Sequence, residues 1–138
     1  MDLGYFSIEE LRCHETKTLP SDSILDSDEF TLFVTILNEM RGQTPLLVSS
    51  WYRSPLHSVE RAKLHPGVHT TGLAADLVVQ GQRAIDVCAW FLRVHKDVAG
   101  LGVSQKGSTR FIHCDLGGTE IVRKTLNPAP PRPTIWSY

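Results

Sequence analysis

HTTGLAAD, residues 69–76, places a histidine ahead of a short apolar run that ends in an aspartate. FIHCDLGG, residues 111–118, is a second apolar stretch with a histidine and an aspartate at its centre. Residues 72–79 and 109–116 are each predicted to form a strand. A carboxylate inside a buried strand is unfavourable unless a cation, several donors or a metal compensates it. The two stretches therefore predict neighbouring strands of a sheet with a polar site on one face.

Strand alternation sorts the polar side chains of these stretches. On the second strand, His113 and Asp115 share one face. Asp76 lies on one face of the first strand, and two neighbouring strands would bring it to His113. His69 lies just ahead of the first strand, and Gly72 allows the backbone to bend so that the imidazole returns over it. We therefore expect His69, Asp76 and His113 to converge.

Two imidazoles and one carboxylate form a common catalytic zinc set, which leaves a fourth position for water. Zinc lowers the pKa of that water to about 7 and polarises a carbonyl. A structural interpretation competes with this one: His69 caps a loop, Asp76 pairs with an arginine, and His113 is a hydrogen-bonded core histidine. From the residues alone, both interpretations remain open.

Helices are predicted on either side of these strands in the sequence. Ser7 and Glu10 form a capping box that begins a short helix. A longer helix is predicted to begin after Ser27 and to end at Gly42. An amphipathic helix is predicted over residues 82–99. Its inward side chains are predicted to be Ile85, Cys88, Ala89, Phe91 and Leu92.

The remaining segments are predicted to be strands, loops and an extended tail. LLVSSWYR, residues 46–53, is a β-type run, and residues 15–26 and 54–68 have the composition of loops. Residues 101–116 are predicted to form a hairpin around Gln105-Lys106-Gly107. The Pro-rich residues 126–138 are expected to be an extended strap held by Ile135, Trp136 and Tyr138. Together these elements predict an α+β fold, a small antiparallel sheet with flanking helices, in a single domain over residues 1–138.

Composition excludes several classes of protein. The chain has 138 residues, 41% hydrophobic and 21% charged, with a formal net charge of −1. This charge gives no global attraction to nucleic acid or an anionic membrane, and no apolar run has the length of a membrane span. The acidic start MDLGYFSIEELR is unlike a secretory signal, so synthesis in the cytoplasm without a signal peptide is expected. The three cysteines form no CxxC pair and indicate no disulfide framework.

These motifs resemble those of the zinc D-Ala-D-Ala carboxypeptidases and related peptidoglycan peptidases, a superfamily that also contains the Hedgehog signalling domain. HTTGLAAD resembles their SxHxxGxAxD motif, FIHCD their F-V-H-V-D strand, and VSSWYRSP their S-G-Y-R-S-P segment. YFSIEELRC resembles the opening of small members, many of them bacteriophage endolysins, and TIWSY resembles their W-x-Y finish. The resemblance covers nearly the whole chain in the same order and implies a Hedgehog/DD-peptidase-like fold.

The resemblance also implies roles for individual residues. His69, Asp76 and His113 match the ligands of one zinc ion per chain. Arg53 matches the arginine that binds carboxylate or carbonyl groups of the substrate, and its planar fork suits a carboxylate. The alternative for Arg53 is a structural salt bridge. Ser50 and Tyr52 belong to the same segment, where they would either touch substrate or pack.

The general base departs from the pattern of many relatives, which carry an acid three residues before the last histidine or a histidine two before it. This chain has Arg110 and Phe111 at those positions, and neither can accept a proton from water. Asp115 is the nearest acid on the same strand face and is the predicted general base. The alternative is a carboxylate that orients a zinc ligand.

The expected function is that of a zinc metallopeptidase, a hydrolase of peptidoglycan stem peptides that acts through zinc-activated water. It would be a DD-carboxypeptidase or an endopeptidase, with the compact build of a phage endolysin. Its partner would be the peptide substrate, it would work as a monomer, and it would reach the bacterial cell wall on release or as part of a virion. Two alternatives remain: a non-catalytic zinc-binding module, such as a phage structural or protein-binding domain, and a metal-free domain.

Overall fold

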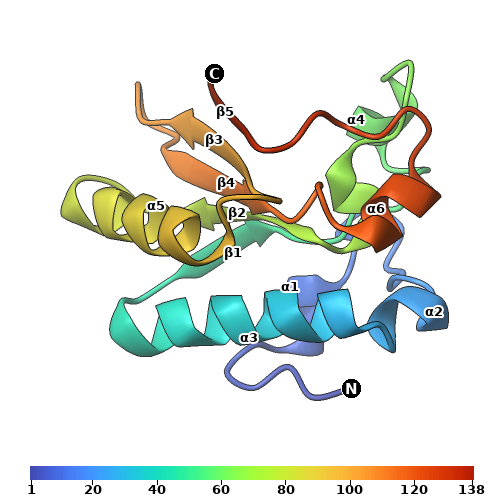
Figure 1. Cartoon of the computed structure of the whole chain (residues 1–138), viewed down its shortest axis with the longest axis horizontal. Coiled ribbons are helices and arrows are strands. Elements are labelled where there is room, and N and C mark those ends of the chain that lie inside the picture. Colours follow the sequence, from blue (N-terminus) through green and yellow to red (C-terminus); the bar gives the residue numbers. More distant parts are fainter.

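A five-stranded sheet forms the centre of the computed structural model, which describes residues 1–138 (Figure 1). The strands are β1 (Leu47–Ser50), β2 (Ala74–Val78), β3 (Gly100–Ser104), β4 (Phe111–Asp115) and β5 (Thr134–Ser137). Their order in the sheet is β1-β2-β4-β3-β5. All neighbours are antiparallel except β3 and β5, which are parallel. The predicted α+β class and the β3–β4 hairpin are confirmed, and the sheet is antiparallel up to its last pair.

Six α-helices and one 3₁₀-helix surround the sheet. They are α1 (Ile8–Leu11), α2 (Asp22–Leu25), α3 (Asp28–Gln43), α4 (Ser58–Arg61), η1 (Val68–Thr71), α5 (Gln82–His95) and α6 (Glu120–Thr125). The predicted capping box of Ser7 and Glu10 is present at α1, and the Ser27 side chain accepts from Phe30 N–H to cap α3. The single turns α2 and α4 lie in stretches predicted to be loops, since such short helices leave no periodic signal. No helix has both the length and the hydropathy that crossing a membrane requires.

Trp51 is the centre of the core between α3 and the sheet. Its side chain is buried, with Phe6 and Phe33 meeting it edge-on and Phe30 stacked on it. The indole N–H donates to the Gly72 carbonyl at 2.8 Å, so the core is tied to the segment that precedes β2. In Figure 1, α3 runs along one side of the strands and the C-terminal segment along the other.

The predicted inward face of α5 is confirmed at Phe91, which is buried, and at Cys88 and Leu92, which pack partly buried against the core, but it is wrong at Ile85 and Ala89. Its buried residues are Ala84, Val87 and Phe91, whereas Ile85 is 61% exposed and Ala89 is also exposed. Apolar residues occur around much of this helix, so the hydrophobic pattern admits two adjacent stripes. Packing against β4 and α3 selects the stripe that contains Ala84 and Val87.

The C-terminal strap is held in part as predicted, because Trp136 is partly buried and the Tyr138 ring lies 5.1 Å from the Phe111 ring between centroids, whereas Ile135 faces solvent. Residues 134–137 do form a strand, but Ile135 and Tyr138 are each 62% exposed. Trp136 is the partly buried member, because it lies on the face of β5 that points over β3. The strap is therefore fixed by main-chain pairing and by side chains on the Trp136 face.

Gly72 makes the bend between η1 and β2 that the sequence predicted. Its φ is +74°, a left-handed conformation that an L side chain adopts only with strain. A Cβ at this position would lie 3.0 Å from Pro20 Cγ. The bend allows His69, on η1, to turn back toward β2.

We predict that Gly72→Ala lowers the free energy of unfolding by about 1–2 kcal/mol, because alanine must adopt the strained conformation. Gly42→Ala is the matched control. Gly42 lies in α3 with an ordinary 3.9 Å contact from its Cβ position to Tyr5, so alanine should stabilise by about 0.5–1 kcal/mol. Urea denaturation measures both, and equal effects of the two substitutions would contradict this account of Gly72.

Candidate metal centre

Three different elements supply the side chains of the predicted metal site. His69 comes from η1, Asp76 from β2 and His113 from β4. Asp76 and His113 are directly opposite in the antiparallel register of β2 and β4. Their neighbours on the other face, Ala75 and Cys114, point into the core, so burial of that face turns the polar pair to the same side.

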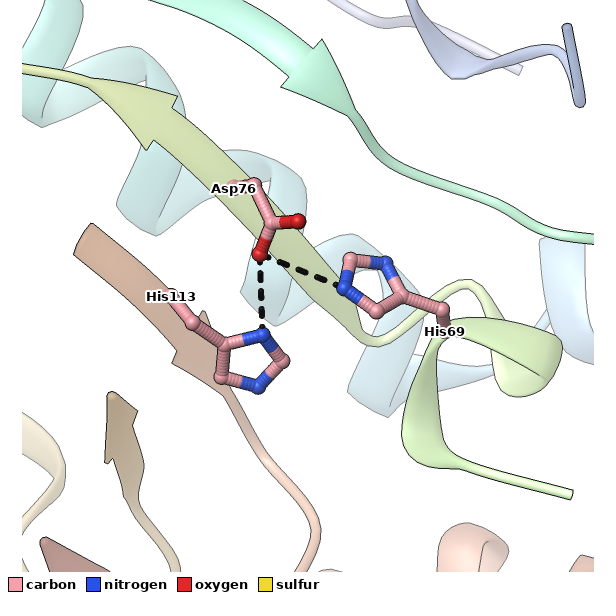
Figure 2. A group of neighbouring side chains, drawn as sticks. All are labelled: His69, Asp76 and His113. Carbon is pink, nitrogen blue, oxygen red and sulfur yellow. Dashed lines mark hydrogen bonds and ion pairs between the residues drawn. The ribbon is translucent and has the colours of Figure 1, made fainter. Parts of the chain in front are cut away.

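The three side chains converge on one point (Figure 2). Asp76 Oδ1 lies 3.0 Å from His113 Nδ1 and 3.3 Å from His69 Nε2. The potential ligand atoms of the three residues all lie within 4.8 Å of one another. All three residues are buried, and Asp76 is the most exposed at 8%. The structure thus brings together the side chains that the sequence predicted to meet.

The outer nitrogen of each imidazole has an acceptor of its own. His69 Nδ1 lies 2.6 Å from the Trp51 carbonyl oxygen, and His113 Nε2 lies 2.7 Å from Asp115 Oδ2. A carbonyl and a carboxylate can only accept, so each outer nitrogen carries the proton. An inner nitrogen that carries no proton presents a lone pair toward Asp76, which is itself an acceptor. Such a cluster is satisfied either by a second proton on an imidazole or by a metal ion between the three residues.

The shifted pKa values of His69, Asp76 and His113 indicate how these three side chains are protonated. Burial lowers the pKa of His69, which favours a neutral ring with a free lone pair. Burial alone would raise the pKa of Asp76, but hydrogen bonds from His113 and His69 outweigh it, and that pKa lies far below its usual value. For His113, burial is outweighed by Asp115 and Asp76, which raise its pKa. A metal ion must therefore displace a proton from His113, so binding should weaken in acid.

The donor set fits a zinc ion. Two imidazole nitrogens and a carboxylate oxygen are the protein ligands of open, catalytic zinc sites. Ligands at zinc-bond distances from a tetrahedral ion lie about 3.3 Å from one another. The 3.0 Å and 3.3 Å separations from Asp76 Oδ1 match that spacing. His69 and His113 also meet edge to face, with ring centroids 5.0 Å apart.

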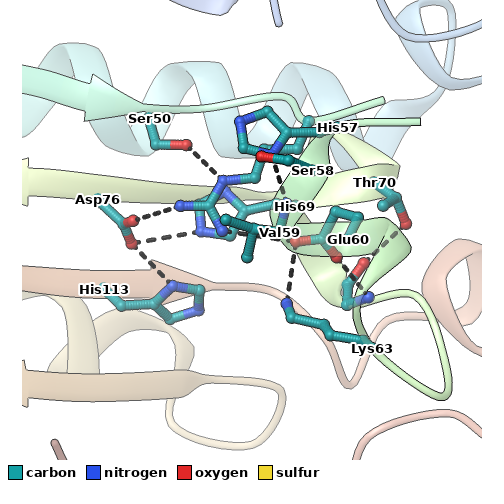
Figure 3. A network of polar contacts seen from close by, with 12 residues as sticks. Ser50, His57, Ser58, Val59, Glu60, Lys63, His69, Thr70, Asp76 and His113 are labelled. Atoms are coloured by element: carbon teal, nitrogen blue, oxygen red, sulfur yellow. Dashed lines mark hydrogen bonds and ion pairs between the residues drawn. The ribbon is translucent and has the colours of Figure 1, made fainter. Parts of the chain in front are cut away.

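Arg53 lies beside this cluster and is held from two sides by Ser50, Asp76 and Glu60, which are labelled in Figure 3. Its Nε donates to Ser50 Oγ at 3.0 Å, and its Nη2 lies 3.4 Å from Asp76 Oδ2. On the other side, Arg53 Nη1 lies 3.5 Å from Glu60 Oε2. The Arg53 side chain remains 20% exposed, beside the predicted ligand Asp76.

The family model described as Peptidase M15 matches residues 4–115 of the chain. The chain belongs to the peptidase M15 family. This confirms the family resemblance seen in the sequence, and membership supports a peptidase, that is, a hydrolase. No curated protein and no solved structure matches the chain. The family match ends at Asp115, so β5 and the segment before it lie beyond the matched residues of this M15 chain.

Asp115 occupies a different place from that expected of a general base. Its Oδ2 contacts His113 Nε2 and Arg132 Nη2, each at 2.7 Å, and its Oδ1 accepts from Arg132 Nε at 2.9 Å and Gly117 N–H at 2.8 Å. A carboxylate has about four acceptor positions, and all are used here. Burial would raise the pKa of Asp115, but these donors lower it to about 2. This geometry favours the alternative role, a carboxylate that orients His113.

Two further residues of the arginine segment have structural contacts. Ser50 accepts from Arg53, so it sets the direction of the guanidinium. Tyr52 is buried and belongs to the hydrophobic core cluster. Burial raises the pKa of Tyr52. In this M15 chain Tyr52 therefore packs, which was the alternative to substrate contact.

Glu60 is a site residue that the sequence did not indicate. Its side chain is fully buried and contacts Arg53, Lys63 at 2.9 Å and Gly67 N–H at 2.9 Å. Burial would raise the pKa of Glu60, but these donors lower it. Glu60 lies on α4, in a stretch with no periodicity, so only the folded chain reveals that it closes the loop over Arg53.

We predict that the chain binds a single zinc ion and that His69→Ala weakens binding by at least about 100-fold, because one of the three protein ligands is lost. His14→Ala, which removes an exposed histidine, is the control and should leave zinc affinity unchanged. Titration against a chromophoric zinc chelator measures both affinities. Undiminished binding by the His69 variant would exclude His69 as a ligand.

Proposed function

We propose that the chain is a zinc-dependent peptidase that cleaves peptidoglycan stem peptides. The observation that carries the proposal is the set of convergent acceptors, His69 Nε2, His113 Nδ1 and Asp76 Oδ1, with both outer imidazole nitrogens already engaged. This arrangement leaves the inner atoms free for a cation, and membership of the M15 family supports peptidase chemistry.

His69, Asp76 and His113 would hold zinc and leave a coordination position free for the reaction. When bound, zinc would polarise the scissile carbonyl and lower the pKa of the attacking water. The protein's own part is orientation: the Trp51 carbonyl fixes the His69 ring, and Asp115 fixes the His113 ring. Burial of these groups keeps competing water from the ligand atoms.

Arg53 would bind an anionic or carbonyl group of the substrate next to the zinc ligands. Its contacts with Asp76 and Glu60, at 3.4 Å and 3.5 Å, are longer than the roughly 2.7–2.9 Å of a full charge-assisted hydrogen bond. The guanidinium therefore keeps donor capacity for a ligand. A terminal carboxylate, as on a peptide that ends in D-Ala-D-Ala, matches the planar fork best.

The setting that follows is a monomeric enzyme acting at the bacterial cell wall, reached on release or as part of a virion, in the manner of a phage endolysin. A second candidate is a non-catalytic zinc-binding module, a phage structural or protein-binding domain. One observation favours it: Asp115, the acid nearest the ligands in sequence, has no acceptor position left for a proton from water.

A digest of purified peptidoglycan separates these two candidates. We expect the zinc-loaded chain to release new amino groups, a chelator to abolish the release, and added zinc to restore it. His69→Ala should be inactive at the same protein concentration. Zinc binding without any amine release would reject the peptidase and leave the zinc-binding module.

We predict that Arg53→Met lowers kcat/KM for a peptide with a free carboxyl terminus by about 10–100-fold, since hydrogen bonds to a charged group contribute about 1.5–3 kcal/mol. The same peptide with an amidated terminus should lose much less. Arg12→Met, which removes an arginine paired with Glu9 on the N-terminal segment, is the control. Equal losses for the two peptides would reject carboxylate recognition by Arg53.

A further inference from the structure

Arg132 joins the C-terminal segment to the metal centre. Its guanidinium donates to both oxygens of Asp115, with Nε 2.9 Å from Oδ1 and Nη2 2.7 Å from Oδ2. Only 8% of the Arg132 side chain is exposed, and the Asp115 side chain is fully buried. Asp115 Oδ2 is also the acceptor of His113 Nε2, so a continuous path of hydrogen bonds runs from Arg132 to a predicted zinc ligand.

The contact between Arg132 and Asp115 crosses β3, where glycines leave room for it. β3 lies between β4 and β5, and Gly100 and Gly102 are its residues opposite Asp115 and His113. A Cβ at Gly100 would overlap Arg132 Nε and both carboxylate oxygens of Asp115. A Cβ at Gly102 would lie 2.7 Å from the Trp136 ring. The two glycines therefore open a gap through which side chains from the C-terminal segment reach β4.

Trp136 occupies the part of this gap that lies over Gly102. Its ring lies against His113, with centroids 5.2 Å apart, and the Arg132 guanidinium lies 5.2 Å from the Trp136 ring centroid. A cation over an aromatic face is attracted to it. Trp136 thus restrains Arg132 and His113 together, and it does so from β5, which pairs with β3 through Gly102.

We propose that Arg132 is a positioning residue of the metal centre, acting through Asp115 to aim His113 Nδ1 at the ion; this rests on the proposed role of His113 as a zinc ligand. A carboxylate held at both oxygens presents one fixed acceptor to His113 Nε2. That contact fixes both the ring orientation and the nitrogen that carries the proton. Without the fork, Asp115 would keep only Gly117 N–H and His113 as partners, and its orientation would loosen.

Zinc affinity and the visible spectrum of the cobalt-substituted chain test this proposal without using activity. Arg132→Met should weaken zinc binding by about 10–100-fold, the usual effect of losing a group that orients a metal ligand. It should also shift the cobalt d–d bands, because His113 would meet the ion in a changed geometry. Arg132→Lys keeps the positive charge but not the planar guanidinium. Its zinc affinity and cobalt bands should lie between those of the wild type and those of Arg132→Met.

Arg41→Met is the matched control, because Arg41 also forms a two-pronged pair, with Glu10 at 2.7 Å and 3.1 Å, but contacts only the N-terminal segment and the Leu46 carbonyl. It should lower stability without changing zinc affinity or the cobalt bands. A double variant, Asp115→Asn with Arg132→Met, should bind zinc no more weakly than Asp115→Asn alone, because Arg132 acts through that carboxylate.

Wild-type zinc affinity and cobalt bands in folded Arg132→Met would overturn the proposal. If that variant does not fold, Arg132→Lys decides the matter by the same two measurements, with unchanged values again counting against positioning. A wild-type chain that binds no zinc gives a different result, because it removes the proposed function itself together with this inference.

Discussion

The antiparallel pairing of β2 with β4 is the constraint on which the site depends. It sets Asp76 directly opposite His113, and opposed residues on one face of a sheet have Cβ atoms about 4.5–5.5 Å apart. The register is held by the other face, where Leu77 and Ile112 are fully buried. A slip of one residue would exchange the core face for the site face. The hydrophobic core thereby fixes the distance between two of the predicted ligands.

The third ligand depends on the same core through Trp51. The indole of Trp51 packs among Phe6, Phe30 and Phe33 and donates to the Gly72 carbonyl, while its main-chain carbonyl accepts from His69 Nδ1. One residue therefore anchors the core, the bend before β2 and the orientation of an imidazole. Asp115 orients the His113 imidazole in the same way, and Asp115 is itself held by Arg132.

Strand alternation and the short separation of His69 from Asp76 were enough to predict which three side chains meet. Alternation gives the face on which a side chain lies, and so it also placed Asp115 near His113. It cannot say which nitrogen of His113 an oxygen faces, so the sequence left open whether Asp115 acts as general base or orients His113; in the structure Asp115 lies at Nε2, the nitrogen that points away from Asp76. Glu60 and Arg132 escaped prediction because each reaches the site from a stretch without periodicity, through contacts that only the folded chain creates.

Anomalous diffraction at the zinc absorption edge, from crystals of the zinc-soaked chain, tests the central claim most directly. We expect a single strong peak about 2.0–2.2 Å from His69 Nε2, His113 Nδ1 and a carboxylate oxygen of Asp76, with Asp115 on the far side of the His113 ring. A peak at any other group of side chains, or a zinc ion ligated by Asp115, would contradict it.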